Sequence, residues 1–249
     1  MLNENHIIDN KNTQSEPLLA KEPDIPLWKR LTLFGISMFF LFIFPLLAYI
    51  MVLGVPKEQK DVAINFICYG VMFVCMFAII VVDIPKYVSK FKDWTNYLIG
   101  FGFGVAIILF DIAYINLARL HPAYGLNQNE STIRNSLNFY PALQVIFLGF
   151  IGPITEELAH RAGVFKSLSK VNKILAYIVS SLIFAFLHFG WTNPNYITEW
   201  INFPLYVVSG AVLAFAYDKY SIVASSTAHI TNNLYSVIIP MIVTGVIHA

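Results

Sequence analysis

Long apolar stretches separated by short polar links dominate the pattern of this chain. An α-helix needs roughly 20 apolar residues to cross the hydrocarbon core of a bilayer, and most of these stretches reach that length. The expected spans lie at about 31–54, 62–82, 94–118, 140–168, 174–190, 200–217 and 220–247. The pattern therefore predicts an all-α fold, a polytopic membrane helix bundle of about seven transmembrane helices.

The polar segments suggest how the chain is divided. Residues 1–27 are polar and contain three prolines, so we expect a disordered or surface-lying cytoplasmic tail there. No internal repeat or second domain is evident, and residues 28–249 are expected to form a single transmembrane helical domain. Two stretches between spans, 83–93 and 119–139, are expected to be polar loops, and the second is rich in Asn and Ser.

Composition supports a membrane protein. Hydrophobic residues make up 57% of the chain and charged residues only 12%, whereas soluble domains carry about 25% charged residues. The lipid bilayer is therefore an expected partner. The net charge of +1 argues against nucleic acid as a partner, because binding to phosphates needs a basic surface.

The basic residues are unevenly divided between the two sides of the predicted bundle. If the N-terminus lies inside, eleven of the 16 Lys and Arg residues fall on inner segments, four fall on outer segments, and Arg161 lies within a span. Inner segments of membrane proteins carry the excess of basic residues. We therefore expect a multi-pass protein of the cell membrane with a cytoplasmic N-terminus.

The densest polar cluster inside an apolar segment covers residues 155–161, with the sequence TEELAHR. Charged side chains are costly in hydrocarbon, so they usually face the interior of a bundle and serve a function. Glu157 and Arg161 are four residues apart, which allows them to pair on one helix face. We expect this ion pair to be a structural brace, with Glu156 pointing about 100° away around the helix.

Three further polar residues, His188, His229 and Asn233, lie within later predicted spans. A rise of about 1.5 Å per residue puts them at a depth comparable to that of Glu156, in the middle or inner part of the membrane. Any one of them taken alone is more often a helix–helix hydrogen-bonding residue than a catalyst. Asp111 is equally open between a structural and a transport role, and the role of His160 is also open.

Three motifs occur in order along these segments. They are Glu156-Glu157-Leu158-Ala159-His160-Arg161, Phe184-Ala185-Phe186-Leu187-His188 and His229-Ile230-Thr231-Asn232-Asn233. In this respect the chain resembles the CPBP family, the intramembrane endopeptidases that include type II CAAX prenyl proteases and the bacteriocin-processing or immunity (Abi) proteins. The resemblance covers about residues 95–240, which would then be the catalytic core. One departure is Ala162, where family members commonly have Gly.

The resemblance implies catalytic roles for four residues. Glu156 is expected to be the general base, assisted by His188 in activating a water molecule. His229 and Asn233 are expected to form the oxyanion hole. A carboxylate in an apolar cavity suits a base that works near neutrality, and buried donors stabilise developing charge most strongly.

The same resemblance implies supporting and alternative roles. Glu157 and Arg161 would orient the base. A metal-free mechanism is favoured because the chain has neither H-E-x-x-H nor H-x-x-E-H, with zinc as the alternative. If zinc were bound, its ligands would come from Glu156, His188 and His229.

The implied function is an intramembrane endopeptidase acting on a membrane-associated peptide or protein. Candidate substrates are a CAAX-type lipidated C-terminus, a leader peptide, or the precursor of a peptide pheromone. One alternative is a non-catalytic bacteriocin immunity or scaffold protein with the same fold. A proton-coupled transporter is a further alternative, which the lack of an internal repeat disfavours.

Overall fold

The computed structural model describes residues 23–245, and this part of the chain is helical with no β-strand. The α-helices are α1 (Leu27–Phe42), α2 (Phe44–Met51), α3 (Lys60–Ile80), α4 (Ile84–Lys92), α5 (Trp94–Ala118), α6 (Gln128–Ser136), α7 (Pro141–Ile146), α8 (Gly152–Glu157), α9 (Lys166–Ser169), α10 (Lys173–Leu187), α11 (Tyr196–Lys219) and α12 (Ile222–Val243). Short 3₁₀ turns, η1 (Lys57–Gln59) and η2 (Val81–Asp83), flank α3, and two π-helical segments, η3 (Phe147–Ile151) and η4 (Leu158–Phe165), join α7, α8 and α9. The predicted all-α polytopic bundle is confirmed.

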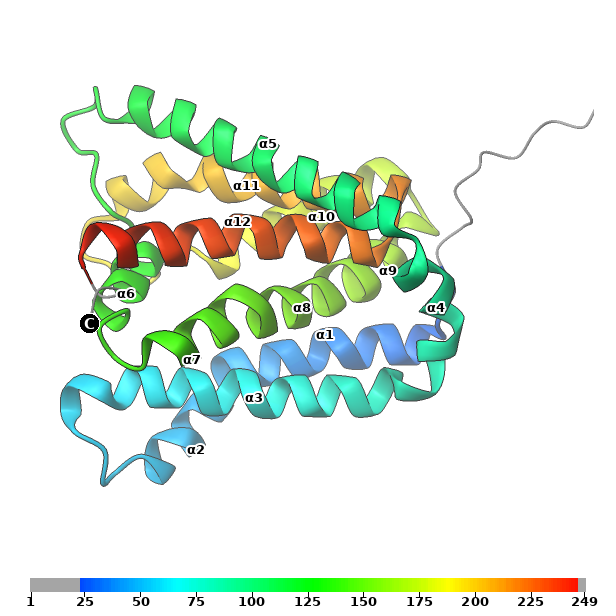
Figure 1. Ribbon diagram of the computed structural model, residues 1–249, viewed down its shortest axis with the longest axis horizontal. Helices are drawn as coiled ribbons and strands as arrows, with labels where there is room; N and C mark the ends of the chain where they lie inside the picture. Colours follow the sequence, from blue (N-terminus) through cyan, green and yellow to red (C-terminus); the bar gives the residue numbers. More distant parts are fainter. Residues whose placement is uncertain (1–22, 246–249) are drawn as a thin grey trace, which may run out of the picture.

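The long helices lie side by side along the longest axis of the molecule (Figure 1). The helix α12 has a central position, packed against α5, α8 and α11, while α3 and α1 form the opposite side of the bundle. The short helices α4 and α9 lie at one end, together with the start of α1. The helices α6 and α7 lie at the other end, near the last residues of α12.

The expected number of spans needs correction. Among residues 23–245, four continuous helical segments are long and apolar enough to cross a membrane, at Lys57–Lys92, Trp94–Ala118, Pro141–Ser169 and Tyr196–Lys219. The pair α1 and α2 makes a fifth if its 51° bend is counted within one span. Pro45 in the first turn of α2 has no N–H to continue the helix, which accounts for this break.

The two remaining expected spans are helical but do not meet this criterion. The helix α10 has only 15 residues, a length of about 22 Å against a hydrocarbon core of about 30 Å. The helix α12 has 22 residues, but its run of Ser, Thr, His and Asn from Ser225 to Asn233 lowers its hydropathy. Both helices have polar residues that are buried inside the bundle. Mean hydropathy therefore does not show whether such a helix crosses the membrane.

Two expected loops also differ from the prediction. The stretch 83–93 contains the amphipathic helix α4, and 119–139 contains α6, which begins where the Asn127 side chain accepts a hydrogen bond from the Glu130 N–H. Both helices are too short and too polar to show in a pattern dominated by membrane spans. Of the expected tail 1–27, residues 1–22 lie outside the described residues, and Ile25 is buried against the bundle.

Close packing of α5 on α12 fixes one wall of the interior. A Cβ atom added at Gly100 would lie 2.5 Å from the Ala224 carbonyl oxygen, and one added at Gly104 would lie 2.5 Å from the Thr231 Cβ. These two glycines therefore allow the helix backbones to approach closely, as small residues four apart do in membrane helices.

Candidate active site

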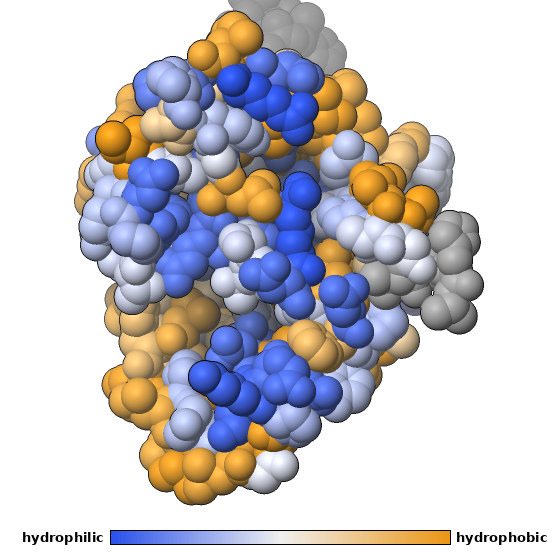
Figure 2. All heavy atoms as spheres, turned by 90° about the vertical axis from the view of Figure 1, so that its left-hand side faces the viewer, coloured by the Kyte–Doolittle hydropathy of each residue, from blue (hydrophilic) through white to orange (hydrophobic). Residues whose placement is uncertain are grey.

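A cavity of about 1180 Å³ lies among α3, α5, α8, α10, α11 and α12, at the end of the bundle where α6 lies. Figure 2 views that end and shows hydrophilic side chains gathered within a rim of hydrophobic ones. Glu156, His188, His229 and Asn233 all line this cavity. The expected convergence of these four residues is therefore present, while their catalytic roles stay predictions.

Glu156 is the centre of the arrangement. Its Oε1 accepts a hydrogen bond from the Tyr69 hydroxyl at 3.1 Å. Its Oε2 is buried and has no hydrogen-bond partner among the described residues. The Nε2 atoms of His188 and His229 each lie 3.7 Å from this same oxygen, so three polar atoms surround one small space.

The hydrogen bonds on the far side of each ring determine what these atoms can do. His188 Nδ1 lies 2.8 Å from the Phe184 carbonyl oxygen, which can only accept, so Nδ1 carries the proton. His229 Nδ1 lies 3.0 Å from Glu157 Oε1, and an ionised carboxylate likewise only accepts. In the neutral rings both Nε2 atoms are therefore acceptors facing Glu156 Oε2, and the space between them suits a molecule with two donors, such as water.

The expected ion pair between Glu157 and Arg161 is present and fully buried. Arg161 Nε donates to Glu157 Oε2 at 3.1 Å, and the Ser225 hydroxyl donates to the same oxygen. Because Glu157 Oε1 receives His229, this carboxylate is satisfied on both oxygens. The brace thus contacts the site through His229, and its expected role in orienting the base Glu156 stays a prediction.

The helix that carries this motif has an irregular backbone. The segment Pro141–Ser169 is continuous, but η3 and η4 widen it to the π-helical pattern on both sides of α8. Pro153 in the first turn of α8 lacks the N–H that a regular helix would use. A π-helical segment contains an extra residue in its helical turn, which alters where neighbouring side chains point, and such segments are frequent at functional sites.

Phe184 is the packing centre behind the site. Its ring lies 4.5 Å from that of His188 and 5.5 Å from that of His229, measured between centroids. The Arg161 guanidinium lies 5.4 Å from the same ring, in reach of a cation–π interaction. His160 packs edge-on to Phe184 at 5.7 Å and is buried away from the cavity lining, so its position is that of a packing residue.

Asn233 reaches the cavity with part of its amide already used. Its Nδ2 donates to the Leu148 carbonyl oxygen at 3.0 Å, across to η3. An amide nitrogen has two N–H groups, so one donor remains for a ligand. This is the donor that an oxyanion hole would require.

Two tyrosines contact the expected site residues and were not predicted. Tyr69 of α3 binds Glu156, as described above, and Tyr206 of α11 stacks on His188 with centroids 4.8 Å apart. The Tyr206 hydroxyl accepts hydrogen bonds from the side chains of Asn127 and Asn129, at 2.8 and 3.3 Å. No sequence signal distinguishes these tyrosines from the many others in apolar helices.

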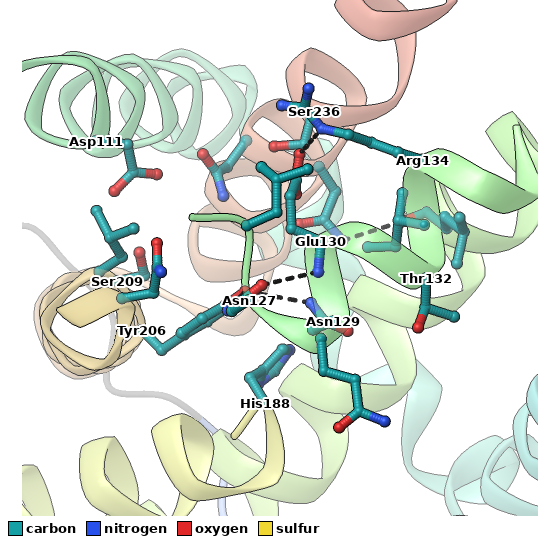
Figure 3. Close-up of a pocket in the computed structure, with 18 of the residues that line it drawn as sticks. Asp111, Asn127, Asn129, Glu130, Thr132, Arg134, His188, Tyr206, Ser209 and Ser236 are labelled. Atoms are coloured by element: carbon teal, nitrogen blue, oxygen red, sulfur yellow. Dashed lines mark hydrogen bonds and ion pairs between the residues drawn. The ribbon is translucent and has the colours of Figure 1, made fainter. Parts of the chain in front are cut away.

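Figure 3 shows how the α6 region closes over the cavity, with Asn127 and Asn129 directed at Tyr206 beside His188. A buried carboxylate, Glu199, also holds this region. Its oxygens accept the backbone N–H of Gln128 at 2.7 Å and that of Gly190 at 2.9 Å. The start of α6 is therefore connected to Tyr206, whose ring stacks on His188, and through Glu199 to the loop that follows His188.

The zinc alternative can be compared with this geometry. Within residues 23–245, no group of three or more His, Cys, Asp and Glu side chains is arranged to hold a metal ion. Glu156, His188 and His229 do converge, and both histidines are oriented from Nδ1 as ligating histidines usually are. The side-chain chemistry thus fits zinc, and metal analysis distinguishes the two mechanisms.

The fold and this site define a class: a polytopic helical membrane protein with a glutamate and two histidines around a buried cavity. Residues 138–235 match the family model described as "Type II CAAX prenyl endopeptidase Rce1-like". The matched segment contains all three motifs, so the resemblance that the motifs predicted is confirmed over this part of the chain.

Several curated relatives are similar over much of the chain. An "Uncharacterized protein" of Mycoplasma capricolum is 30% identical over 167 residues, covering 62% of this chain and 47% of its own. The UPF0177 protein YvdC of Lactococcus lactis is 24% identical over 164 residues, covering 64% and 58%, and YajF of the same organism is 22% identical over 167 residues, covering 65% and 77%. The chain thus spans about half the length of the first two relatives, and no solved structure matches it.

Proposed function

We propose that this protein is an intramembrane endopeptidase that hydrolyses a membrane-associated peptide or protein with water activated by Glu156 and His188. One observation carries the proposal. The unpaired Glu156 Oε2 faces two imidazole Nε2 atoms at 3.7 Å each, inside a cavity large enough for a peptide segment. Three acceptors around one space can hold a water molecule by both of its protons.

The proposed reaction starts from that water. One O–H donates to Glu156 Oε2 and the other to a histidine Nε2, which leaves an oxygen lone pair free to attack a peptide carbonyl carbon. As the new C–O bond forms, Glu156 takes the proton. Glu156 then returns this proton to the amide nitrogen as the C–N bond breaks, so that a carboxylic acid and an amine leave.

Charge on the attacked oxygen needs donors. The free N–H of Asn233 is one candidate, since its other N–H is held by the Leu148 carbonyl oxygen. His229 can contribute from Nε2 only when its ring is doubly protonated, because Nδ1 already donates to Glu157. Removing one such donor costs about 10²–10³ in kcat in other hydrolases.

The proposal also includes the location, the orientation and the substrate of the protein. We place the protein in the cell membrane with its N-terminus in the cytoplasm, on the basis of the basic residues of its inner segments. Its substrate would be a lipidated CAAX-type C-terminus, a leader peptide, or a pheromone or bacteriocin precursor. A non-catalytic immunity protein or a transporter would use the same cavity without cleaving a peptide.

The test is a cleavage assay with purified protein in detergent and a mixture of quenched-fluorescent peptides, with products identified by mass spectrometry. Glu156→Gln and His188→Ala should each lower the rate at least about 10²-fold. Glu58→Gln, at an exposed position, is the matched control and should retain full activity. Undiminished cleavage in both site variants, or none by the wild type, contradicts the proposal.

A further inference from the structure

Two acceptor atoms in the cavity wall have no partner, and the proposed hydrolysis does not use them. Asp111 Oδ1 on α5 and Asn232 Oδ1 on α12 are both buried, and neither has a hydrogen-bond partner among the described residues. Both residues line the cavity that contains Glu156. Buried polar atoms are almost always hydrogen-bonded, so two unpaired acceptors in one cavity call for an explanation.

Helical spacing puts these two residues at the level of the catalytic histidine. An apolar layer closes the cavity with residues from four helices, Ile107, Phe184, Leu213 and Ala228. One helical turn away, on the same faces and toward the α6 end, the four helices carry Asp111, His188, Ser209 and Asn232. Figure 3 shows Asp111 pointing from α5 into the space that Ser209 and Tyr206 of α11 also border.

No cation of the described residues neutralises Asp111. Arg134 lines the same cavity but pairs with Glu130 at 2.7 Å. Arg119 also lines the cavity, but it follows the last residue of α5, eight residues beyond Asp111 and about 12 Å further along the helix axis. Arg161 is held by Glu157.

We propose that Asp111 and Asn232 form a subsite for a protonated amine or a guanidinium group of the substrate, such as a Lys or Arg side chain close to the scissile bond. This inference rests on the proposed function and adds the chemical class of the substrate. Both unpaired atoms are acceptors, so their ligand has to supply N–H or O–H donors. An ammonium or guanidinium supplies several donors and the positive charge that a buried carboxylate requires.

A binding experiment tests the subsite without any cleavage. The probes are n-octylammonium and n-octanol, which share an alkyl chain and differ in the charged donor group, and the readout is thermal stabilisation of the detergent-purified protein. The wild type should bind octylammonium more tightly than octanol. Asp111→Asn should weaken octylammonium binding by about tenfold and leave octanol binding unchanged, as expected for the loss of one charge-assisted hydrogen bond.

Two further variants serve as a control and as a second test of this binding experiment. Glu156→Gln should keep the preference for octylammonium, since the Glu156 carboxylate is not part of the subsite. Asn232→Ala should lower the preference about threefold, and it serves if Asp111→Asn does not fold. The proposal is overturned if the wild type shows no preference, if Asp111→Asn retains it, or if Glu156→Gln removes it.

A cleavage experiment then connects the subsite to the substrate. Quenched-fluorescent peptides are compared in pairs that differ only by Lys or norleucine near the cleaved bond. Asp111→Asn should lower kcat/KM about tenfold for the Lys peptide and leave the norleucine peptide unchanged. An equal loss on both peptides overturns the proposal, whereas absence of cleavage by the wild type contradicts the proposed function and leaves octylammonium binding to decide the subsite.

Discussion

His229 Nδ1 donates a hydrogen bond to Glu157 Oε1 at 3.0 Å, across 72 residues of chain. Through this contact the second carboxylate of the acidic pair orients an imidazole whose other nitrogen faces Glu156, the first carboxylate of the pair. The ion pair between Glu157 and Arg161 therefore serves the site as well as the bundle. Neighbouring glutamates in one motif thus have different partners and different expected roles.

Replacing Glu157 with Gln should damage both stability and activity. The change leaves the buried Arg161 without its counter-ion, which costs about 3–5 kcal/mol in comparable buried pairs, and it releases His229. The measurement is the melting temperature in detergent together with the cleavage rate. Glu58→Gln again serves as the control, and a variant as stable and active as the wild type would contradict the role of this carboxylate.

Tyr69→Phe should lower kcat by about tenfold or more with little change in KM. The substitution removes only the hydroxyl that donates to Glu156 Oε1, and hydrogen bonds to charged groups are worth about 1.5–3 kcal/mol. Tyr97→Phe is the matched control, because its hydroxyl contacts the Phe91 carbonyl oxygen at an exposed site. Equal kinetics for the two variants would show that Tyr69 does not position the base.

Tyr206→Phe should loosen the α6 region while keeping the ring that stacks on His188. The variant loses the oxygen that accepts hydrogen bonds from Asn127 and Asn129. Hydrogen exchange of residues 127–136 should therefore become faster, while exchange in α12 stays unchanged. Unchanged exchange in 127–136 would mean that the Tyr206 hydroxyl does not hold the segment.

Metal analysis addresses the choice between the two mechanisms. We expect purified active protein to contain no stoichiometric zinc and to keep its cleavage rate in the presence of chelator. The measurement is elemental analysis followed by the peptide assay. Stoichiometric zinc whose removal abolishes cleavage would replace the water-activating glutamate mechanism by one in which Glu156, His188 and His229 are ligands.

The ion pairs at the opposite end of the bundle predict a small pH effect on stability. A hydrogen bond from Lys170, with further attraction from Arg30, lowers the pKa of Asp24 below its usual value of 3.8. A lowered folded-state pKa means that the stabilisation is present above the unfolded-state value and is lost as pH falls through the lower value. Asp24→Asn should therefore lower the melting temperature slightly at pH 7, since the exposed ion pairs of Asp24 contribute less than about 1 kcal/mol to the free energy of unfolding. Well below pH 3.8 the melting temperature of the variant should match that of the wild type.

Local spacing in the sequence predicted what depends on one helix alone. The pair Glu157 and Arg161 follows from a separation of four residues, and the apolar stretches predicted helices wherever the structure has a long one. The family motifs also led to the four residues that meet in the cavity. The ion pair and the helices follow from spacing and residue type, and the four cavity residues follow from the resemblance to the family, so none of them requires knowledge of how the helices pack.

Packing between helices decided the rest. Three features depend on which helices face each other and at what depth in the bundle. They are the contact of His229 with Glu157, the contact of Tyr69 with Glu156, and the position of Asp111 one turn from the apolar layer. The count of spans depended on it too, because α10 and α12 are helices whose polar faces are buried in the bundle. The sequence by itself determined the helices and, through the motifs, the four residues that meet in the cavity. Only the tertiary structure decided their orientation, because side-chain direction across a cavity depends on contacts between segments far apart in the chain.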